Sequence, residues 1–168
     1  MFPDEFEAKA TSLLAALRAR QMMLATAESC TGGLIAALLT EIPGSSDVVD
    51  RGFVTYSNDA KIAMLGVRAD VIAAHGAVSR EVALAMAEGA LVHSEADITV
   101  AVTGVAGPGG GTPQKPVGLV HVAAARIGMN PEHRECRFGP LSRSEIRLAT
   151  VDAALDLLAS LADRSGSS

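Results

Sequence analysis

A junction between an apolar run and an apolar helix holds an unusual concentration of reactive side chains. The stretch "TAESCTGGLIAALL", residues 26–39, has a glutamate, a serine, a cysteine, a threonine and two glycines in a row. Main-chain N–H groups at the start of a helix lack partners within it, and these groups and the helix dipole favour negative charge. If Ser29 attacked a carbonyl there, the developing oxyanion would lie beside those N–H groups. This chemistry is acyl transfer with a serine nucleophile.

The same segment also has a simpler interpretation as a capped turn. Ser29 or Thr31 would then be only a helix N-cap, and the glycines would only permit tight packing. Glu28 could accept a hydrogen bond from a ligand hydroxyl or merely cap the helix. Cys30 is a rival nucleophile, because a thiol at a helix N-terminus has a lowered pKa, or it is a small buried hydrophobe. Taken alone, the segment favours the capped turn.

A serine nucleophile needs a base, and no histidine accompanies the polar clusters, so a Ser-His-Asp triad is poorly supported. Lys61, in "YSNDAKI", lies just past an expected strand end. To act as a base its amine must be neutral, which requires lowering its pKa from ~10.4 towards 7, about 4–5 kcal/mol of differential stabilisation. Tyr56 could relay a proton or orient the amine. The alternative is an exposed helix lysine and a tyrosine packed at the rim.

Two further segments suggest anion binding. "TGVAGPGGG", from Thr103 to Gly111, can form a nest of main-chain N–H groups, although it lacks the Walker and G-x-G-x-x-G patterns. Arg143 and Arg147 lie four residues apart on an expected helix, so they share a face and could reach a phosphate. A flexible loop and a solvated helix flank are the simpler explanations.

The elements that must position these residues alternate between helix and strand. Hydrophobic periodicity, caps and breakers predict the following elements. Helices are expected over 4–20, 31–42, 58–66, 69–75, 80–93 and from a Ser142–Glu145 capping box to 162, and strands over 22–27, 48–57, 97–104, 117–127 and 132–138, the last two as an antiparallel pair. This order indicates a three-layer α/β/α fold with a mixed, mainly parallel sheet and helices on both faces. Because ligands in such folds lie beyond the carboxyl ends of strands, we expect the three polar segments to converge.

Composition limits the classes of function. The 168 residues fit one domain, 1–163, followed by a frayed tail, 164–168. The net charge of −5, without blocks of like charge, argues against a nucleic-acid surface. No apolar run reaches the roughly 18 residues of a membrane span, and the first residues lack signal-peptide character. The two cysteines and four histidines show no metal-ligand spacing. We therefore expect a cytoplasmic protein without metal, cofactor, nucleic-acid or membrane partner.

Six motifs in order are more specific than any one of them. "AESCTGG", "YSNDAK", "GAVS", "MAEGA", "VTGVAGPGGGT" and "KPVGLVHVA" resemble the C-terminal domain family of the competence/damage-inducible protein CinA, from about residue 5 to 162. The resemblance implies a nicotinamide-nucleotide amidase. Stand-alone members hydrolyse the carboxamide of nicotinamide mononucleotide to nicotinate mononucleotide and ammonia, in recycling of pyridine nucleotides. They are metal-free serine amidases with a lysine base and a tyrosine, and the family suggests a homodimer.

The resemblance also implies roles for individual residues. Ser29 would be the nucleophile, Lys61 the base and Tyr56 its helper. The implied oxyanion donors are the main-chain groups of Cys30, Thr31, Gly32 and Gly33, and the implied substrate contacts are Glu28, Thr103, Gly104, Ala106, Gly107 and a late arginine. The segment "FGPLSRSEIR" departs from the family pattern, which leaves open whether Arg143 or Arg147 faces the ligand. Many relatives carry a preceding pyrophosphatase-like domain, and we expect this chain to lack that activity.

Two other functions remain open from the sequence. The first is a binding module that holds a nucleotide or phosphate metabolite without chemistry, for which the glycine loops and arginines serve equally well. The second is a cysteine enzyme with Cys30 as nucleophile. We rank the serine amidase first and the thiol enzyme last.

Overall fold

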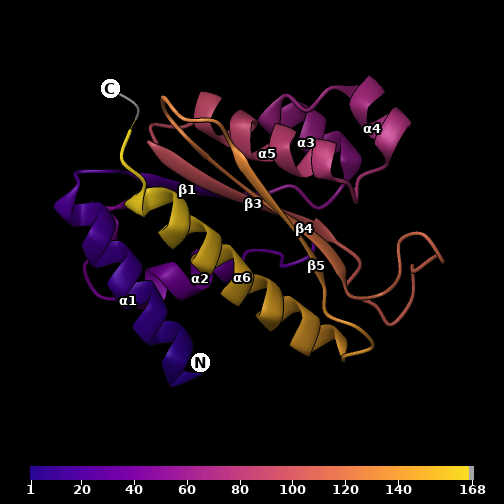
Figure 1. Ribbon diagram of the computed structural model, residues 1–168, viewed down its shortest axis with the longest axis horizontal. Helices are drawn as coiled ribbons and strands as arrows, with labels where there is room; N and C mark the ends of the chain where they lie inside the picture. The colour runs from indigo at the N-terminus through magenta and orange to yellow at the C-terminus, as the bar shows by residue number, and fades with distance from the viewer. Residues whose placement is uncertain (167–168) are drawn as a thin grey trace.

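Helices and strands alternate along most of the chain (Figure 1), in a computed structural model that describes residues 1–166. The elements, in order, are α1 Asp4–Ala19, β1 Leu24–Glu28, α2 Leu34–Glu41, a 3-10 turn Ser45–Asp47, β2 Val49–Val54, α3 Asn58–Leu65, α4 Ala69–His75, α5 Arg80–Val92, β3 Ile98–Gly104, β4 Leu119–Arg126, β5 Glu132–Arg137 and α6 Arg143–Asp163. Every helix and strand expected from the sequence is present, with shifted ends.

The five strands form one sheet in the order β2-β1-β3-β4-β5. β1 pairs in parallel with β2 and β3, whereas β4 is antiparallel to both β3 and β5. It follows that β1, β2, β3 and β5 run in one direction and β4 runs the other way. The expected mixed sheet and the expected antiparallel pair are both confirmed.

Helices cover both faces of the sheet, as expected for a three-layer α/β/α fold. In Figure 1, α3, α4 and α5 lie on one side and α1, α2 and α6 on the other. Strand residues alternate between these layers because successive side chains point to opposite faces. Val100 and Val102 pack in the core with α1, α2 and α6, whereas Ala101 and Ala123 pack in the core with α5. The small alanines allow α5 to lie close to the sheet.

The capping signals at Ser79 and Ser142 are confirmed, whereas neither Ser29 nor Thr31 is the N-cap of α2, which is Gly33. The Ser79 hydroxyl accepts a hydrogen bond from the Val82 N–H, 3.2 Å long, at the start of α5. Ser142 and Glu145 form the expected reciprocal capping box at the start of α6. These bonds satisfy main-chain N–H groups that have no partner within their own helices.

The helix after β1 begins three residues later than expected, at Leu34 rather than Thr31. The reason is the conformation of the two glycines. Gly32 has φ +59° and Gly33 has φ +104°, which are values that a right-handed helix cannot include. Residues 29–34 therefore form turns, and the reactive segment is a turn rather than the first turn of a helix.

The expected frayed tail, 164–168, is anchored at its first residue. The main-chain carbonyl of Arg164 accepts a hydrogen bond of 2.8 Å from Arg126 Nη1, and its guanidinium pairs with Glu132. Residues 167–168 lie outside the described residues. Across residues 1–166, no helix combines the length and apolarity that crossing a membrane requires.

Candidate active site

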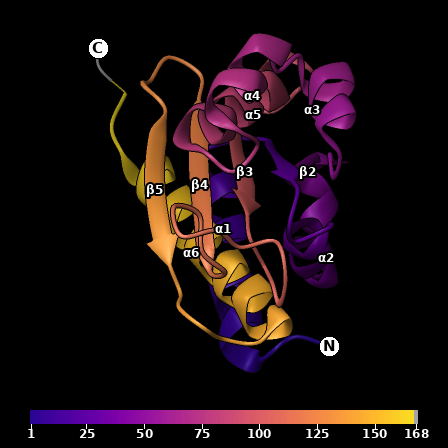
Figure 2. The same cartoon turned by 90° about the vertical axis from the view of Figure 1, so that its right-hand side faces the viewer.

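The three polar segments meet at one edge of the sheet. They follow β1, β2 and β3, which are adjacent and parallel, so their carboxyl ends lie together. The Ser29 N–H donates to the Val102 carbonyl of β3, 3.1 Å away. The loop after β3 extends to the N-terminal turn of α6 (Figure 2), where Arg143 Nη1 donates to the Gly107 carbonyl at 2.7 Å. The expected convergence is confirmed.

Lys61 and Ser29 are in direct contact at this edge. Lys61 Nζ lies 3.0 Å from Ser29 Oγ, 2.9 Å from the Thr55 carbonyl and 3.4 Å from the Tyr56 carbonyl. The hydroxyl of Ser57 caps α3, which carries Lys61 back beneath the end of β2. The lysine is 1% exposed, so it is not the surface lysine that its position on a short helix would equally have allowed.

The surroundings of Lys61 favour its neutral form. Burial lowers the pKa of Lys61 below the ordinary 10.5, although Cys30 acts in the opposite direction. Within the described chain no carboxylate forms an ion pair with its amine. A neutral amine has two N–H donors and one lone pair. The carbonyls of Thr55 and Tyr56 accept the two N–H bonds, and the lone pair is left for the hydroxyl of Ser29. This arrangement is that of a general base and its nucleophile.

Of the two alternatives for Cys30, an activated thiol and a small buried side chain, the structure favours the second. Burial raises the pKa of its thiol to about 11. The thiolate, not the thiol, is the nucleophile, so Cys30 is inert at neutral pH. Because α2 starts only at Leu34, Cys30 is not at the helix N-terminus but in the packed part of the turn.

The turn after Ser29 determines which main-chain donors are free. The Gly32 N–H donates to the Ser29 carbonyl at 3.0 Å, and the Leu34 N–H donates to the Thr31 carbonyl at 3.2 Å. The positive φ of both glycines makes the second of these a type I′ turn. Of the four residues expected to supply oxyanion donors, Gly32 already uses its N–H. The N–H groups of Cys30, Thr31 and Gly33 have no main-chain acceptor in residues 1–166.

Glu28 caps a helix from within the core. Its side chain is 1% exposed. Its carboxylate accepts hydrogen bonds from the Thr31 hydroxyl at 2.6 Å, the Ile35 N–H at 2.8 Å and the Ala36 N–H at 3.0 Å. Of the two roles considered for Glu28, the structure favours capping over contact with a ligand hydroxyl, because these donors use both carboxylate oxygens.

The loop after β3 is held by hydrogen bonds and by packing. The buried Thr103 hydroxyl donates to the Ala77 carbonyl at 2.9 Å, which ties the end of β3 to the turn before α5. A Cβ on Gly104 would lie 2.6 Å from Val120 Cγ2. The absence of a side chain at Gly104 therefore lets β3 and β4 approach each other closely. Ala106 is also buried. One expected loop residue contacts another candidate residue: the Gly107 carbonyl accepts a hydrogen bond from Arg143.

The two arginines of α6 face different parts of the site. Arg143 is exposed, and its Nη2 lies 3.3 Å from the hydroxyl of Tyr56, whose side chain is 63% exposed. Arg147 is half-buried and donates from Nε to the Cys30 carbonyl at 3.2 Å and from Nη2 to the Thr31 carbonyl at 3.0 Å. Arg143 is thus exposed and contacts Tyr56, whereas Arg147 contacts the carbonyls of the turn that follows Ser29. In the described residues, no group of three His, Cys, Asp or Glu side chains is arranged to hold a metal ion.

Solved structures of other proteins have the same fold. The competence/damage-inducible protein CihA from Agrobacterium tumefaciens has 56% identity and a TM-score of 0.94, over 96% of this chain and 98% of that one. A competence-damaged protein (CinA) superfamily protein from Klebsiella pneumoniae has 36% identity and a TM-score of 0.88, over 94% of this chain and 97% of that one.

Curated relatives carry related names. A putative competence-damage inducible protein of Symbiobacterium thermophilum is 60% identical over 67% of this chain and 26% of its own length. A CinA-like protein of Colwellia psychrerythraea is 47% identical over 92% of this chain and 35% of its own length. The chain therefore spans between a quarter and about a third of these two relatives. The model of the CinA C-terminal domain matches residues 6–162, and the chain belongs to this family.

Proposed function

We propose that the chain is a nicotinamide-nucleotide amidase that hydrolyses the carboxamide of nicotinamide mononucleotide, with Ser29 as nucleophile and Lys61 as base. One observation carries the chemical part of the proposal. A buried amine without a carboxylate partner lies 3.0 Å from a serine hydroxyl, and burial lowers the pKa of that amine. The substrate class comes from the family resemblance, since the printed names of the relatives refer only to competence and damage.

The proposed reaction proceeds through an acyl-enzyme. Neutral Lys61 takes the proton of Ser29 while Oγ attacks the carboxamide carbon. The tetrahedral oxyanion accepts hydrogen bonds from free N–H groups of the turn, those of Cys30 and Gly33, which stabilise charge that exists only in the transition state. The Lys61 ammonium gives its proton to the departing ammonia. Water, deprotonated by Lys61, then attacks the ester and releases nicotinate mononucleotide and Ser29.

Arg143 and Tyr56 are suited to hold the rest of the substrate. Both side chains are exposed and contact each other at 3.3 Å, and the main-chain carbonyl of Tyr56 lies 3.4 Å from Lys61 Nζ. A guanidinium matches the geometry of a phosphate, and the face of a tyrosine ring attracts a cation such as a pyridinium. We assign the phosphate to Arg143 and the pyridinium to the ring of Tyr56.

Ammonia release from nicotinamide mononucleotide, with a chelator present, tests the proposal. Wild type and Cys30→Ala should release ammonia, whereas Ser29→Ala and Lys61→Met should lose activity by about 10²-fold or more, with melting temperatures showing that each variant is folded. Activity in Ser29→Ala would refute the serine mechanism. A folded wild type that is thermally stabilised by the nucleotide but releases no ammonia would be a binding module instead.

A further inference from the structure

We propose that Arg147 is a positioning residue that holds the turn at Ser29–Leu34, and with it the nucleophile Ser29, in the geometry that the reaction needs. The proposal rests on the proposed amidase function. It assigns to Arg147 a role distinct from the substrate contact that its place beside Arg143 on α6 suggests. The observation behind it is the pair of hydrogen bonds from one guanidinium to two consecutive carbonyls, those of Cys30 and Thr31.

The geometry of the turn makes the direction of the Thr31 N–H depend on Arg147. The bond from the Gly32 N–H to the Ser29 carbonyl closes a four-residue turn with Cys30 and Thr31 at its centre. The central peptide joins the Cys30 carbonyl to the Thr31 N–H, and in a trans peptide these two groups point in opposite directions. Because Arg147 holds the carbonyl on one side of the turn, the N–H projects from the other side. Within residues 1–166, the bond from Arg147 is the only hydrogen bond to this peptide, so without it nothing there fixes the rotation of the peptide.

Arg147 also strengthens the hydrogen bonds of the turn. Its positive charge beside the two carbonyl oxygens polarises their peptides, and hydrogen bonds in a chain strengthen one another. The second bond, to the Thr31 carbonyl, adds to the Leu34 N–H bond on the same oxygen and holds the start of the type I′ turn. A planar fork can hold two carbonyls at once, which a lysine ammonium cannot do with the same geometry.

The position of Arg147 fits this role better than contact with substrate. Its Nε and Nη2 are both engaged by main-chain oxygens, and the side chain is half-buried. A Cβ on Gly32 would lie 3.4 Å from Arg147 Nη2, so the guanidinium is packed against the turn itself. Arg143, by contrast, is exposed and bonds the Tyr56 hydroxyl. Arg143 is thus assigned to the substrate, and Arg147 to the turn.

Steady-state kinetics with two substrates separate these roles. Nicotinamide mononucleotide and nicotinamide riboside share the carboxamide but differ in the phosphate. We compare Arg147→Gln and Arg147→Lys with Arg143→Gln. Arg18→Gln is the matched control, because Arg18 also donates to a main-chain carbonyl, that of Gly44 at 2.8 Å, on another part of the surface.

The expected result is a loss in kcat that does not depend on the phosphate. Arg147→Gln should lower kcat about 10- to 100-fold for both substrates with KM within about twofold, a smaller effect than removal of a direct oxyanion donor. Arg147→Lys should retain part of the activity, and Arg18→Gln should match wild type. A rise in KM confined to the mononucleotide would overturn the proposal in favour of phosphate binding by Arg147. Unchanged kinetics would overturn it as well.

A second measurement keeps the proposal testable if wild type hydrolyses neither substrate, which would refute the amidase function alone. Nuclear magnetic resonance of the free protein reports the turn directly. Arg147→Gln should shift the Thr31 and Gly32 amide nitrogen resonances and speed hydrogen exchange at Gly32, whose N–H bonds the Ser29 carbonyl. Arg18→Gln should leave these signals in place. A turn with the same shifts and the same exchange rates in Arg147→Gln would overturn the positioning role.

Discussion

The amine of Lys61 lies between the hydroxyl of Ser29, 3.0 Å away, and the main-chain carbonyl of Thr55, 2.9 Å away. The carbonyl fixes the amine at the end of β2, and the buried surroundings lower the pKa of Lys61. Because β1 and β2 are neighbours in the sheet, the pair is held by the core and not by a mobile loop. This placement is what a serine activated by a neutral lysine requires.

Tyr56→Phe should affect substrate binding more than chemistry. The Tyr56 hydroxyl contacts Arg143. The hydrogen bond between Lys61 and Tyr56 goes to the main-chain carbonyl of Tyr56, which the substitution leaves in place. We expect KM for nicotinamide mononucleotide to rise several-fold and kcat to fall less than about tenfold. Steady-state ammonia release measures both constants. A loss of kcat as large as that of Lys61→Met would show instead that the hydroxyl takes part in proton transfer.

Glu28→Gln should destabilise the fold. The carboxylate accepts three hydrogen bonds in a buried site, and the amide of glutamine would turn an N–H₂ group towards donors. We expect the free energy of unfolding in urea to fall by about 1–3 kcal/mol. Glu5→Gln, on the exposed face of α1, is the control and should change it by less than about 0.5 kcal/mol. Equal stabilities of the two variants would contradict the capping role.

Gly89→Ala should also be destabilising, through packing. A Cβ at Gly89 would lie 2.1 Å from the Leu65 carbonyl oxygen, so α5 and the end of α3 would have to separate. We expect a loss of about 1–3 kcal/mol in the free energy of unfolding. Gly109→Ala is the matched control, since no atom lies within 4 Å of a Cβ there. A tolerated Gly89→Ala would show that the two helices are not in close contact.

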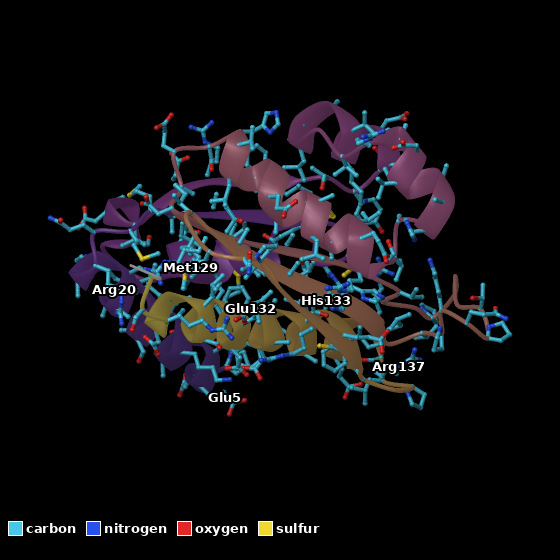
Figure 3. The ribbon with its side chains drawn as sticks, turned by 45° about the horizontal axis from the view of Figure 1, so that its top comes forward. Glu5, Arg20, Met129, Glu132, His133 and Arg137 are labelled. Carbon is cyan, nitrogen blue, oxygen red and sulfur yellow. The ribbon has the colours of Figure 1, made fainter. Side chains whose placement is uncertain are left out.

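A histidine pair on β4 and β5 should make stability depend on pH. His121 Nδ1 and His133 Nε2 are 2.8 Å apart, and Figure 3 shows His133 on β5. Burial lowers the pKa of both rings below the ordinary 6.5; Glu135 opposes the shift, and Lys115 adds to it at His121. Folding thus favours the neutral rings. Their contribution to stability is present above the ordinary pKa of 6.5 and is lost as the pH falls towards and below the lowered values.

Urea denaturation at several pH values measures this dependence. Wild type should lose stability below about pH 6.5 more steeply than His133→Gln, which has no second ring to charge. Glu81, Arg80 and Arg137 also influence these rings and are common to both proteins, so the difference isolates the pair. Identical slopes for the two proteins would contradict the account.

The fold was largely predictable from the sequence because its signals are local. Val, Ile and Ala patterns define the strands, and Ser79, Ser142 and Glu145 define helix starts that the structure confirms. The start of α2 was mispredicted at Thr31, since the pattern "TGGLIAALL" does not reveal that both glycines take positive φ. Between the two alternatives for Cys30, burial decides for the inert thiol, because it raises the pKa.

The site was predictable in its residue types but not in its contacts. Ser29 and Lys61 are 32 residues apart, and only the parallel pairing of β1 with β2 brings them together. Arg147 and the carbonyls that it holds are 116 and 117 residues apart. No spacing rule reports such contacts, which depend on where α6 packs. Glu28 caps α2 from a strand end, seven and eight residues before its N–H partners, a distance at which no capping motif applies.

The pH dependence of kcat/KM for ammonia release from nicotinamide mononucleotide tests the central claim most directly. If neutral Lys61 is the base, the rate must rise with pH as the amine loses its proton, and because its pKa is lowered, the rise must be complete below the 10.5 of an ordinary lysine. The account predicts this single ascending limb in wild type and in Arg143→Gln, and its absence in Lys61→Met. A rate that stayed constant or fell over the same range would show that Lys61 acts as a cation, and would contradict the account.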